Sequence, residues 1–211
     1  MRLYHFTKAE FALQDIQHHR LKIAEIKDLN DPFDLRAPQF KSSKERKNWE
    51  SWRSEMAAKF GMLCFSSDWT NAVMWSHYAD HHRGICLGFD IADEIVRRVE
   101  YTDVRPEIDL SRELQESELG PLLFVKGSDW RYEDEYRVWA SLEERDPQHD
   151  VYFEQFDEKM VLREVIVGPA SNVSRAQLEP FFFGLEPRPE MIKARRAFQS
   201  FRVVKQQLGL K

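Results

Sequence analysis

The order of hydrophobic and polar residues along the chain predicts a mixture of strands and helices. Arg2–Thr7 alternates between the two classes and predicts a strand, because successive side chains of a strand point to opposite faces. Residues 8–18 and 43–60 place hydrophobic side chains at helical spacing, and Gly61 is expected to end the second helix. A short strand is expected between these helices, at Leu21–Ile23.

Hydrophobic runs further along the chain predict buried strands at Met62–Ser66 and Ile85–Asp90, with a helix across Asn71–His82 between them. Residues 91–120 are acidic and weakly patterned, so they indicate little regular structure. Alternating segments predict four more strands, at Val99–Thr102, Trp130–Ala140, Val151–Phe156 and Leu162–Val167.

The last part of the chain predicts one helix from Ser174, another around Pro189–Ala197, and a strand at Phe201–Lys205. Strands and helices are interspersed without a regular strand–helix–strand repeat, so the predicted fold class is α+β. A chain of 211 residues is long enough for one compact domain, and a single domain over 1–211 is expected.

The charge of the chain is unevenly distributed. With 31 basic and 36 acidic residues, the net charge is −5, which does not by itself favour nucleic-acid binding. Residues 188–211, however, hold seven basic residues and one acidic residue. This basic C-terminal helix–strand segment is interpreted either as a solvent-exposed face or as a surface for nucleic acid.

No membrane-spanning segment is predicted. The longest stretch without a charged residue is Trp69–Ala79, which is shorter than the roughly 20 residues that a transmembrane helix needs. The sequence enters its first predicted strand without a signal-like apolar region, and Cys64 and Cys86 lie in predicted buried strands. These features favour a cytoplasmic protein with reduced thiols and no membrane partner.

The strand predicted at Trp130–Ala140 carries the residues most suggestive of chemistry. In a strand, Glu133, Glu135 and Arg137 fall on one face. Two neighbouring carboxylates raise each other's pKa, and an arginine beside them can keep one ionised. Such a pair suits glycosyl transfer, in which a carboxylate stabilises a cationic sugar and binds its 2-hydroxyl. A solvent-exposed face with weak Glu–Arg pairs, worth roughly 0–1 kcal/mol, is the alternative.

Histidines in the predicted Asn71–His82 helix raise the alternative of a metal-dependent hydrolase. His77 and His81 are four residues apart, a spacing at which two helical side chains can share an ion. Because a zinc site needs three or four protein ligands and no third is evident, no metal is predicted. Trp75 and Tyr78 form a stripe typical of a core-facing helix, although such a ring can also stack on a planar ligand.

Glycine-rich phosphate-binding loops are absent, since neither GxGxxG nor GxxxxGK[ST] occurs in the sequence. A nucleotide would therefore have to be held by another arrangement. His5 and Ser66 taken alone are ordinary strand residues, and neither is predicted to be a nucleophile, because nothing local supplies both a base and an orienting acid.

Taken together, six segments resemble a prokaryotic family described as domain of unknown function 2971, which is similar to the ADP-ribosyltransferase fold superfamily. The segments span nearly the whole chain in order and spacing. They are Leu3–Thr7, Asn30–Phe33, Leu63–Ser66, Met74–Asp80, Gly84–Phe89 and Trp130–Arg137.

This resemblance implies an α+β fold with two small β-sheets around a cleft and flanking helices. It also implies that NAD is bound as a substrate. His5 would match the histidine that binds the adenosine-side ribose, Tyr78 the aromatic that stacks on nicotinamide, and Ser66 or Ser76 a contact to the amide. The NAD-binding residues that the resemblance implies are His5, Thr7, Ser66, Tyr78 and Arg137.

The catalytic residues that the resemblance implies are Glu135 and Glu133. Glu135 would match the catalytic glutamate, because Glu135–Trp139 is similar to the superfamily's Glu-Tyr-x-Val-aromatic strand. Glu133 would orient or deprotonate the acceptor, as in the Glu-x-Glu pairing of the arginine-modifying branch. Phe6 departs from the poly-ADP-ribosyl branch, which has glycine after the histidine, and this departure bears on the shape of the pocket.

The function expected from the resemblance is an NAD-consuming ADP-ribosyltransferase-like enzyme, a bacterial toxin or defence effector, with a protein or nucleic acid as acceptor. With water as acceptor, the same site would be an NAD glycohydrolase. The alternative is a non-catalytic module on the same fold that binds nucleic acid or protein. The acceptor and the oligomeric state stay open at this point.

Overall fold

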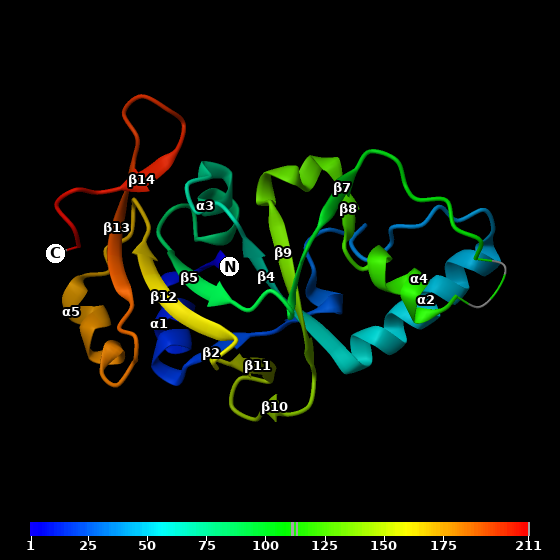
Figure 1. The fold of residues 1–211 in the computed structure, drawn as a ribbon, viewed down its shortest axis with the longest axis horizontal. Coiled ribbons are helices and arrows are strands. Elements are labelled where there is room, and N and C mark those ends of the chain that lie inside the picture. Colours follow the sequence, from blue (N-terminus) through cyan, green and yellow to red (C-terminus); the bar gives the residue numbers. More distant parts are fainter. Residues whose placement is uncertain (111, 113, 211) are drawn as a thin grey trace.

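The computed structural model of the chain describes residues 1–110, 112 and 114–210. Within these residues, a curled nine-stranded sheet carries helices on both faces, so the α+β class predicted from the sequence is confirmed (Figure 1). The strands of this sheet in spatial order are β14 (Val203–Lys205), β13 (Glu190–Arg196), β12 (Met160–Val167), β5 (Ile85–Ile91), β1 (Arg2–Thr7), β4 (Phe60–Ser66), β9 (Glu135–Ser141) and β6 (Val96–Arg98), with β3 (Ala24–Glu25) paired to β4.

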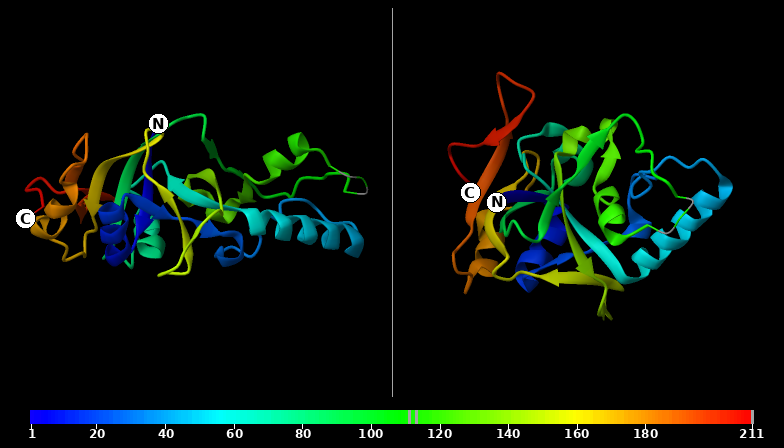
Figure 2. Two further views of the ribbon diagram at one scale, coloured as in Figure 1. Left: turned by 90° about the horizontal axis from the view of Figure 1, so that it is seen from below. Right: turned by 45° about the vertical axis from the view of Figure 1, so that its right-hand side comes forward.

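The remaining elements surround this sheet. Two smaller sheets consist of β10 (Arg145–Asp146), β11 (Val151–Gln155) and β2 (Arg20–Lys22), and of β7 (Glu100–Thr102) and β8 (Val125–Gly127). The helices are α1 (Ala9–His18), η1 (Ile26–Asp28), α2 (Ser43–Lys59), α3 (Ala72–Tyr78), α4 (Glu116–Leu122), η2 (Ser128–Glu133), α5 (Arg175–Leu178) and η3 (Glu179–Phe182). The molecule is elongated, with α2 and α4 at the end opposite α5 and β14 (Figure 2). None of the described helices combines the length and apolar composition needed to cross a bilayer.

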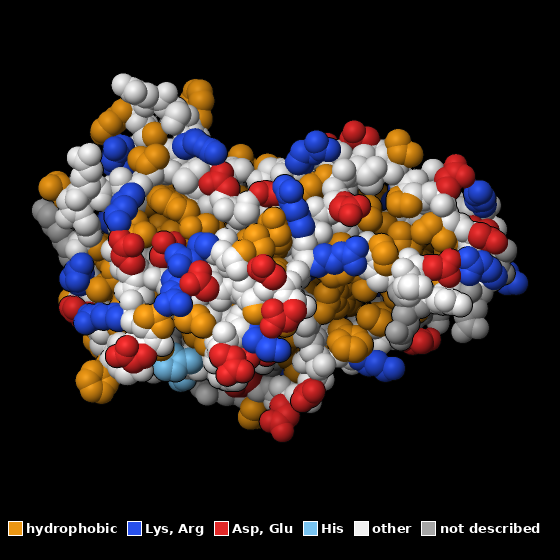
Figure 3. Space-filling view, in the orientation of Figure 1, with side chains coloured by type: hydrophobic (Ala, Val, Ile, Leu, Met, Phe, Trp, Pro, Cys, Tyr) orange, Lys and Arg blue, Asp and Glu red, His pale blue; other side chains and the backbone are white. Residues whose placement is uncertain are grey.

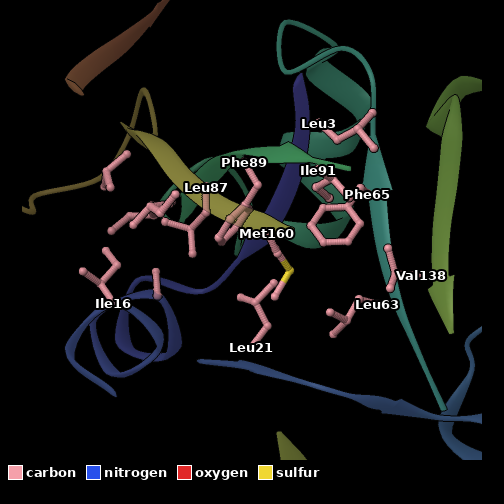
Figure 4. Packing of buried hydrophobic residues seen from close by; sticks show 14 of the residues in the cluster. Leu3, Ile16, Leu21, Leu63, Phe65, Leu87, Phe89, Ile91, Val138 and Met160 are labelled. Atoms are coloured by element: carbon pink, nitrogen blue, oxygen red, sulfur yellow. The ribbon is translucent and has the colours of Figure 1, made fainter. Parts of the chain in front are cut away.

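The core lies on both faces of the central strands. On one face, Ile16 of α1 packs with Leu87 and Phe89 of β5, and all three are fully buried (Figure 4). On the other face, Trp75 of α3 packs against Phe6 of β1. Because β1 alternates, it supplies side chains to both layers, and each large apolar side chain buried in this way contributes about 1.5–3 kcal/mol.

The sheet is nearly divided at its centre. β1 pairs with β5 through six residue pairs, from Arg2–Asp90 to Thr7–Ile85, and β4 pairs with β9 through seven residue pairs. Between β1 and β4, by contrast, Tyr4–Ser66 is the one residue pair found in the described residues. The two small sheets expected from the resemblance are therefore joined into one curled sheet, whose two halves diverge away from this bridge.

The strand predicted at Trp130–Ala140 begins later than expected. Ser128–Glu133 forms the 3-10 helix η2, Asp134 has a left-handed φ of 41°, and β9 starts at Glu135. Glu135 pairs with Ser66, the last residue of β4, so the residues before Glu135 have no neighbouring strand to pair with. The side-chain amide of Asn71 instead donates to the backbone oxygen of Tyr132 at 2.7 Å.

The helix predicted at Pro189–Ala197 is wrong, because Glu190–Arg196 forms strand β13. This strand runs parallel to β12 and antiparallel to β14, so the basic C-terminal segment is a β-hairpin rather than a helix followed by a strand. Ile192 and Ala194 are buried while Met191, Lys193 and Arg195 are only partly buried, which is the period-two pattern of a strand. Lys211, the last basic residue of that segment, lies outside the described residues.

The helix predicted at Asn71–His82 is shorter than expected. It begins after Asn71, whose side chain accepts a hydrogen bond from the backbone of Val73, and α3 ends at Tyr78. Asp80, His81 and His82 then have positive φ angles and turn the chain towards β5. The other predicted helices and strands are confirmed to within a few residues, whereas β6 and α4 form in the region that the pattern left unassigned.

Candidate functional site

A pocket opens where β1 and β4 diverge. Its volume is about 130 Å³, which suits one small ring and is well below the roughly 300 Å³ at which pockets for larger ligands begin. The residues that line it are Tyr4, His5, Phe6, Leu29, Asn30, Asp34, Cys64, Phe65, Ser66, Met74, Tyr78, Lys126, Glu133 and Glu135. The fold thus brings together His5, Ser66, Tyr78, Glu133 and Glu135, which the sequence analysis selected from four separate segments.

Glu135 is held firmly at the start of β9. The Arg137 guanidinium donates to both of its oxygens, with Nε–Oε1 at 2.7 Å and Nη2–Oε2 at 3.0 Å. Lys126 Nζ also donates to Oε2 at 3.2 Å, and the Cys64 thiol nearby helps to lower the pKa of this carboxylate. Burial alone would raise the pKa of Glu135, but Arg137 and Lys126 outweigh it and hold the pKa at about 2.

Arg137 is fully buried behind the pocket and is not part of its lining. Its guanidinium makes a second two-point contact with Asp34, at 2.9 and 2.7 Å, and donates to the backbone oxygen of Leu123 at 2.9 Å. These contacts and those to Glu135 engage all five N–H groups of the side chain. Arg137 therefore has no donor left for a ligand, and it orients the carboxylates instead.

Lys126 is the member of the site that the sequence analysis missed. Its ammonium group is buried on β8 and donates to Glu133 Oε2 at 2.6 Å. Asp34 Oδ2 lies 3.7 Å away, and Glu135 is the third carboxylate in contact. Burial opposes the charge of Lys126, but these carboxylates raise its pKa above the ordinary value. A lone lysine between residues 91–120 and the strand predicted from Trp130, in a stretch with no predicted element, gave no signal that it would be buried among acids.

Glu133 differs from Glu135 in its electrostatic surroundings. Burial raises the pKa of Glu133, and contacts with Lys126 and Tyr78 only partly oppose this effect. The Tyr78 hydroxyl donates to Glu133 Oε1 and accepts a hydrogen bond from the Asn30 side chain at 3.0 Å. The two glutamates thus have pKa values displaced in opposite directions, one above and one below the usual range.

The sequence predicted that the two glutamates share a strand face, and this prediction is wrong. Glu133 ends η2 and Glu135 begins β9, and the left-handed Asp134 between them redirects the chain. Asp134 is fixed by the Ser67 hydroxyl and by Arg98, whose Nη2 lies 2.6 Å from Oδ1. Lys126 then brings the two carboxylates to a common cation.

His5 and Ser66 lie on the two strands that bound the opening. His5 Nδ1 lies 3.0 Å from the backbone oxygen of Cys64, to which it donates, so Nε2 is left as an acceptor. Burial lowers the pKa of His5, which favours this neutral form. Ser66 accepts a hydrogen bond from the Asp68 backbone at 3.3 Å. Thr7 lies two residues beyond His5 on β1 and is not part of the pocket lining.

His77 and His81 do not form the helical pair considered as a metal site. α3 ends at Tyr78, and His81 lies in the following turn with φ of 51°. His77 Nδ1 is 3.0 Å from the Tyr132 hydroxyl. In the part of the chain that the structure describes, no group of three or more His, Cys, Asp or Glu side chains is arranged to hold a metal ion.

Comparison with known proteins adds one relationship. No curated protein and no solved structure matches the chain. Residues 74–138 match the model of a family described as "Protein of unknown function (DUF2971)". This segment runs from α3 into β9 and includes Tyr78, Lys126, Glu133, Glu135 and Arg137. The resemblance to this family of unknown function that the sequence motifs predict is therefore confirmed over residues 74–138.

Proposed function

We propose that the protein is an NAD-consuming enzyme of the ADP-ribosyltransferase type. It would cleave the bond between nicotinamide and ribose and transfer ADP-ribose to a macromolecule or to water. The observation that carries the proposal is the meeting of His5, Ser66, Tyr78, Glu133 and Glu135 at one small pocket. The role as a bacterial toxin or defence effector belongs to the same proposal and rests on the resemblance alone.

The charge of the site supports chemistry on a cation. Asp34, Glu133 and Glu135 face two cations, Lys126 and Arg137, so the cluster has a net charge of −1 when all five groups are ionised. NAD carries a positive nicotinamide ring, and the ribose becomes an oxocarbenium ion as that ring leaves. A fixed negative charge in a buried site stabilises both species.

The contacts of the two glutamates suggest a division of roles. A carboxylate has about four acceptor positions. Three of those of Glu135 are taken, by two bonds from Arg137 and one from Lys126. We therefore assign Glu135 the role of a fixed charge. Glu133, whose Oε1 is bonded only to Tyr78 among the described residues, is assigned the contact with the ribose hydroxyl or with the acceptor.

In the proposed reaction, the bond between the nicotinamide nitrogen and C1 of the ribose breaks, and its electron pair leaves with neutral nicotinamide. The acceptor then forms a bond to C1 and gives its proton to Glu133, whose raised pKa suits a proton acceptor near neutral pH. The rings of Tyr78, Tyr4 and Phe65 line a space of the size of nicotinamide. The adenosine part of NAD would extend beyond this space.

The proposal is tested with NAD labelled separately in the nicotinamide and adenosine parts. Free nicotinamide and label on protein or nucleic acid are measured in parallel for the wild type and for Glu133→Gln. Loss of a well-placed electrostatic contact costs about 10²–10³ in rate, and a loss of that size is expected. Glu55→Gln, at an exposed position on α2, is the matched control and should leave the rate unchanged. Absence of nicotinamide release by the folded wild type would refute the proposal.

A second candidate, the non-catalytic binding module, is favoured by one observation. The β13–β14 hairpin carries five basic residues and one acidic residue, Glu190, which is paired with Lys205. If the labelled-NAD assay shows neither NAD binding nor turnover, this candidate takes precedence.

A further inference from the structure

The loop between β13 and β14 projects from the molecule with two exposed aromatic rings. Ala197 N donates to Arg202 O at 2.9 Å, which closes a loop over residues 198–201. Phe198 is 91% exposed, and Phe201 is fully exposed. This hairpin tip, residues 195–202, stands clear of the body of the molecule (Figures 1 and 3), with hydrophobic and basic side chains gathered on it (Figure 3).

The tip has positive charge that is not neutralised locally. Among the described residues, no carboxylate lies within ion-pair distance of Arg195 or Arg196, whereas Arg202 is paired with Asp68 at 3.0 Å. The Arg195 guanidinium lies over the Phe198 ring, with Cζ 4.6 Å from the ring centroid. At the tip, a guanidinium group thus lies beside an exposed aromatic ring, which suits a partner that is both anionic and aromatic.

The tip is anchored to the segment that leads into the pocket. Val203 N donates to Thr70 O at 2.9 Å, and Asn71 forms a β-bridge with Arg202. Asn71 also caps α3, the helix that carries Tyr78. A ligand held by the tip would therefore lie on the side of the molecule where α3 begins.

We propose that the hairpin tip binds single-stranded nucleic acid, with bases stacked on Phe198 and Phe201 and phosphates paired with Arg195 and Arg196. Single-stranded nucleic acid presents unstacked bases beside a chain of negative charges, which matches the two kinds of group at the tip. This inference goes beyond the proposed function and does not depend on NAD turnover.

The composition of the tip disfavours a lipid bilayer as the partner. Gln199 and Ser200 lie between the two phenylalanines in the sequence and are exposed. Insertion of both rings into hydrocarbon would carry these polar side chains in with them, at the cost of their hydrogen bonds to water. Stacking on bases leaves the same side chains free to bond to water, phosphate or base edges.

The test is the fluorescence anisotropy of a labelled oligothymidylate of about 12 nucleotides, without NAD, between about 50 and 200 mM salt. We expect Phe198→Ala with Phe201→Ala to weaken binding at least tenfold. We expect Arg195→Gln with Arg196→Gln to weaken binding and to lower the slope of log affinity against log salt by about 1.4, since each single-strand phosphate contact contributes roughly 0.7.

Matched controls are Phe183→Ala, at another exposed phenylalanine, and Lys44→Gln with Lys47→Gln on α2, all of which should bind like the wild type. Binding to phosphatidylserine–phosphatidylcholine vesicles and to a duplex of equal length is measured alongside. The proposal is overturned if the wild type does not bind the oligonucleotide or if the tip variants bind it unchanged. It is also overturned if vesicles alone are bound, or if loss of both rings weakens duplex and single-strand binding equally.

Discussion

At the scale of single residues, Lys126 determines how three buried acids coexist. Its ammonium group contacts Asp34, Glu133 and Glu135, and it lies 4.8 Å from the centroid of the Trp130 ring. Removing one partner from a buried ionic cluster is costly, because the opposite charges are left without compensation in a medium of low polarity.

Lys126→Met is therefore expected to lower the free energy of unfolding by about 3–5 kcal/mol. Urea denaturation followed by circular dichroism measures this change. Lys47→Met, at an exposed position of α2, is the control and should change stability by less than about 0.5 kcal/mol. Equal stability of the two variants would show that Lys126 is not the compensating charge.

The depressed pKa of Glu135 makes a prediction about pH. Its ionised form, held by Arg137 and Lys126 at a pKa of about 2, stabilises the fold above the ordinary glutamate pKa of about 4.3. This stabilisation is lost as the pH falls from there towards 2. Glu135→Gln should therefore be less stable than the wild type at neutral pH, and the difference should shrink below about pH 4. Urea titrations at several pH values check this, and a pH-independent difference would contradict the assignment.

Tyr78 has a hydroxyl and a ring with separable roles. Tyr78→Ala should weaken NAD binding, because the ring that lines the pocket is lost. Tyr78→Phe keeps the ring but removes the hydrogen bond that lowers the pKa of Glu133, so the acid limb of the rate profile should move to higher pH with little change in NAD affinity. Calorimetric titration and pH–rate profiles of nicotinamide release separate the two effects. An unchanged profile for Tyr78→Phe would exclude the coupling.

At the scale of elements, the left-handed Asp134 joins η2 to β9 and so sets the distance between the two glutamates. A β-branched residue is strained at this φ, whereas asparagine tolerates it. Asp134→Val should cost roughly 1–3 kcal/mol more than Asp134→Asn, since both lose the carboxylate that meets Arg98. Urea denaturation of the pair isolates the backbone effect, and equal stabilities would show that the turn is not strained.

The sequence predicted the elements whose own residues determine them. β1, α1 and α2 show the spacing expected of their class. Gly61, which was expected to end α2, lies inside β4, because α2 already ends at Lys59. The errors occur where a neighbour decides. β13 contains one lysine and two arginines, which are compatible with a helix, yet β12 offers it a parallel partner strand. Residues 130–133 alternate like a strand but have no partner strand. Lys126 was missed for the same reason, because its burial depends on acids up to 92 residues away in the sequence.

At the scale of the whole molecule, the family match and the folding unit do not coincide. β5 lies inside residues 74–138, but both of its neighbours in the sheet, β1 and β12, lie outside. A fragment of residues 74–138 should therefore lack a cooperative unfolding transition. Without β1 and β12, both edges of β5 would be unpaired and the core that these strands cover would be exposed to water. Circular dichroism with urea, with the full chain as reference, checks this. A cooperative transition in the fragment would show that it folds alone.

The single Tyr4–Ser66 bridge also bears on how the pocket accommodates what enters it. Most of the sheet resists bending, because each strand is tied to the next by several backbone hydrogen bonds. At this line, a rotation of one half against the other breaks the pairing of Tyr4 with Ser66 and the bond from His5 to the Cys64 backbone. We therefore expect the width of the pocket to change at a smaller cost in backbone hydrogen bonds than the spacing of β1 and β5 or of β4 and β9, which are joined by six and seven residue pairs.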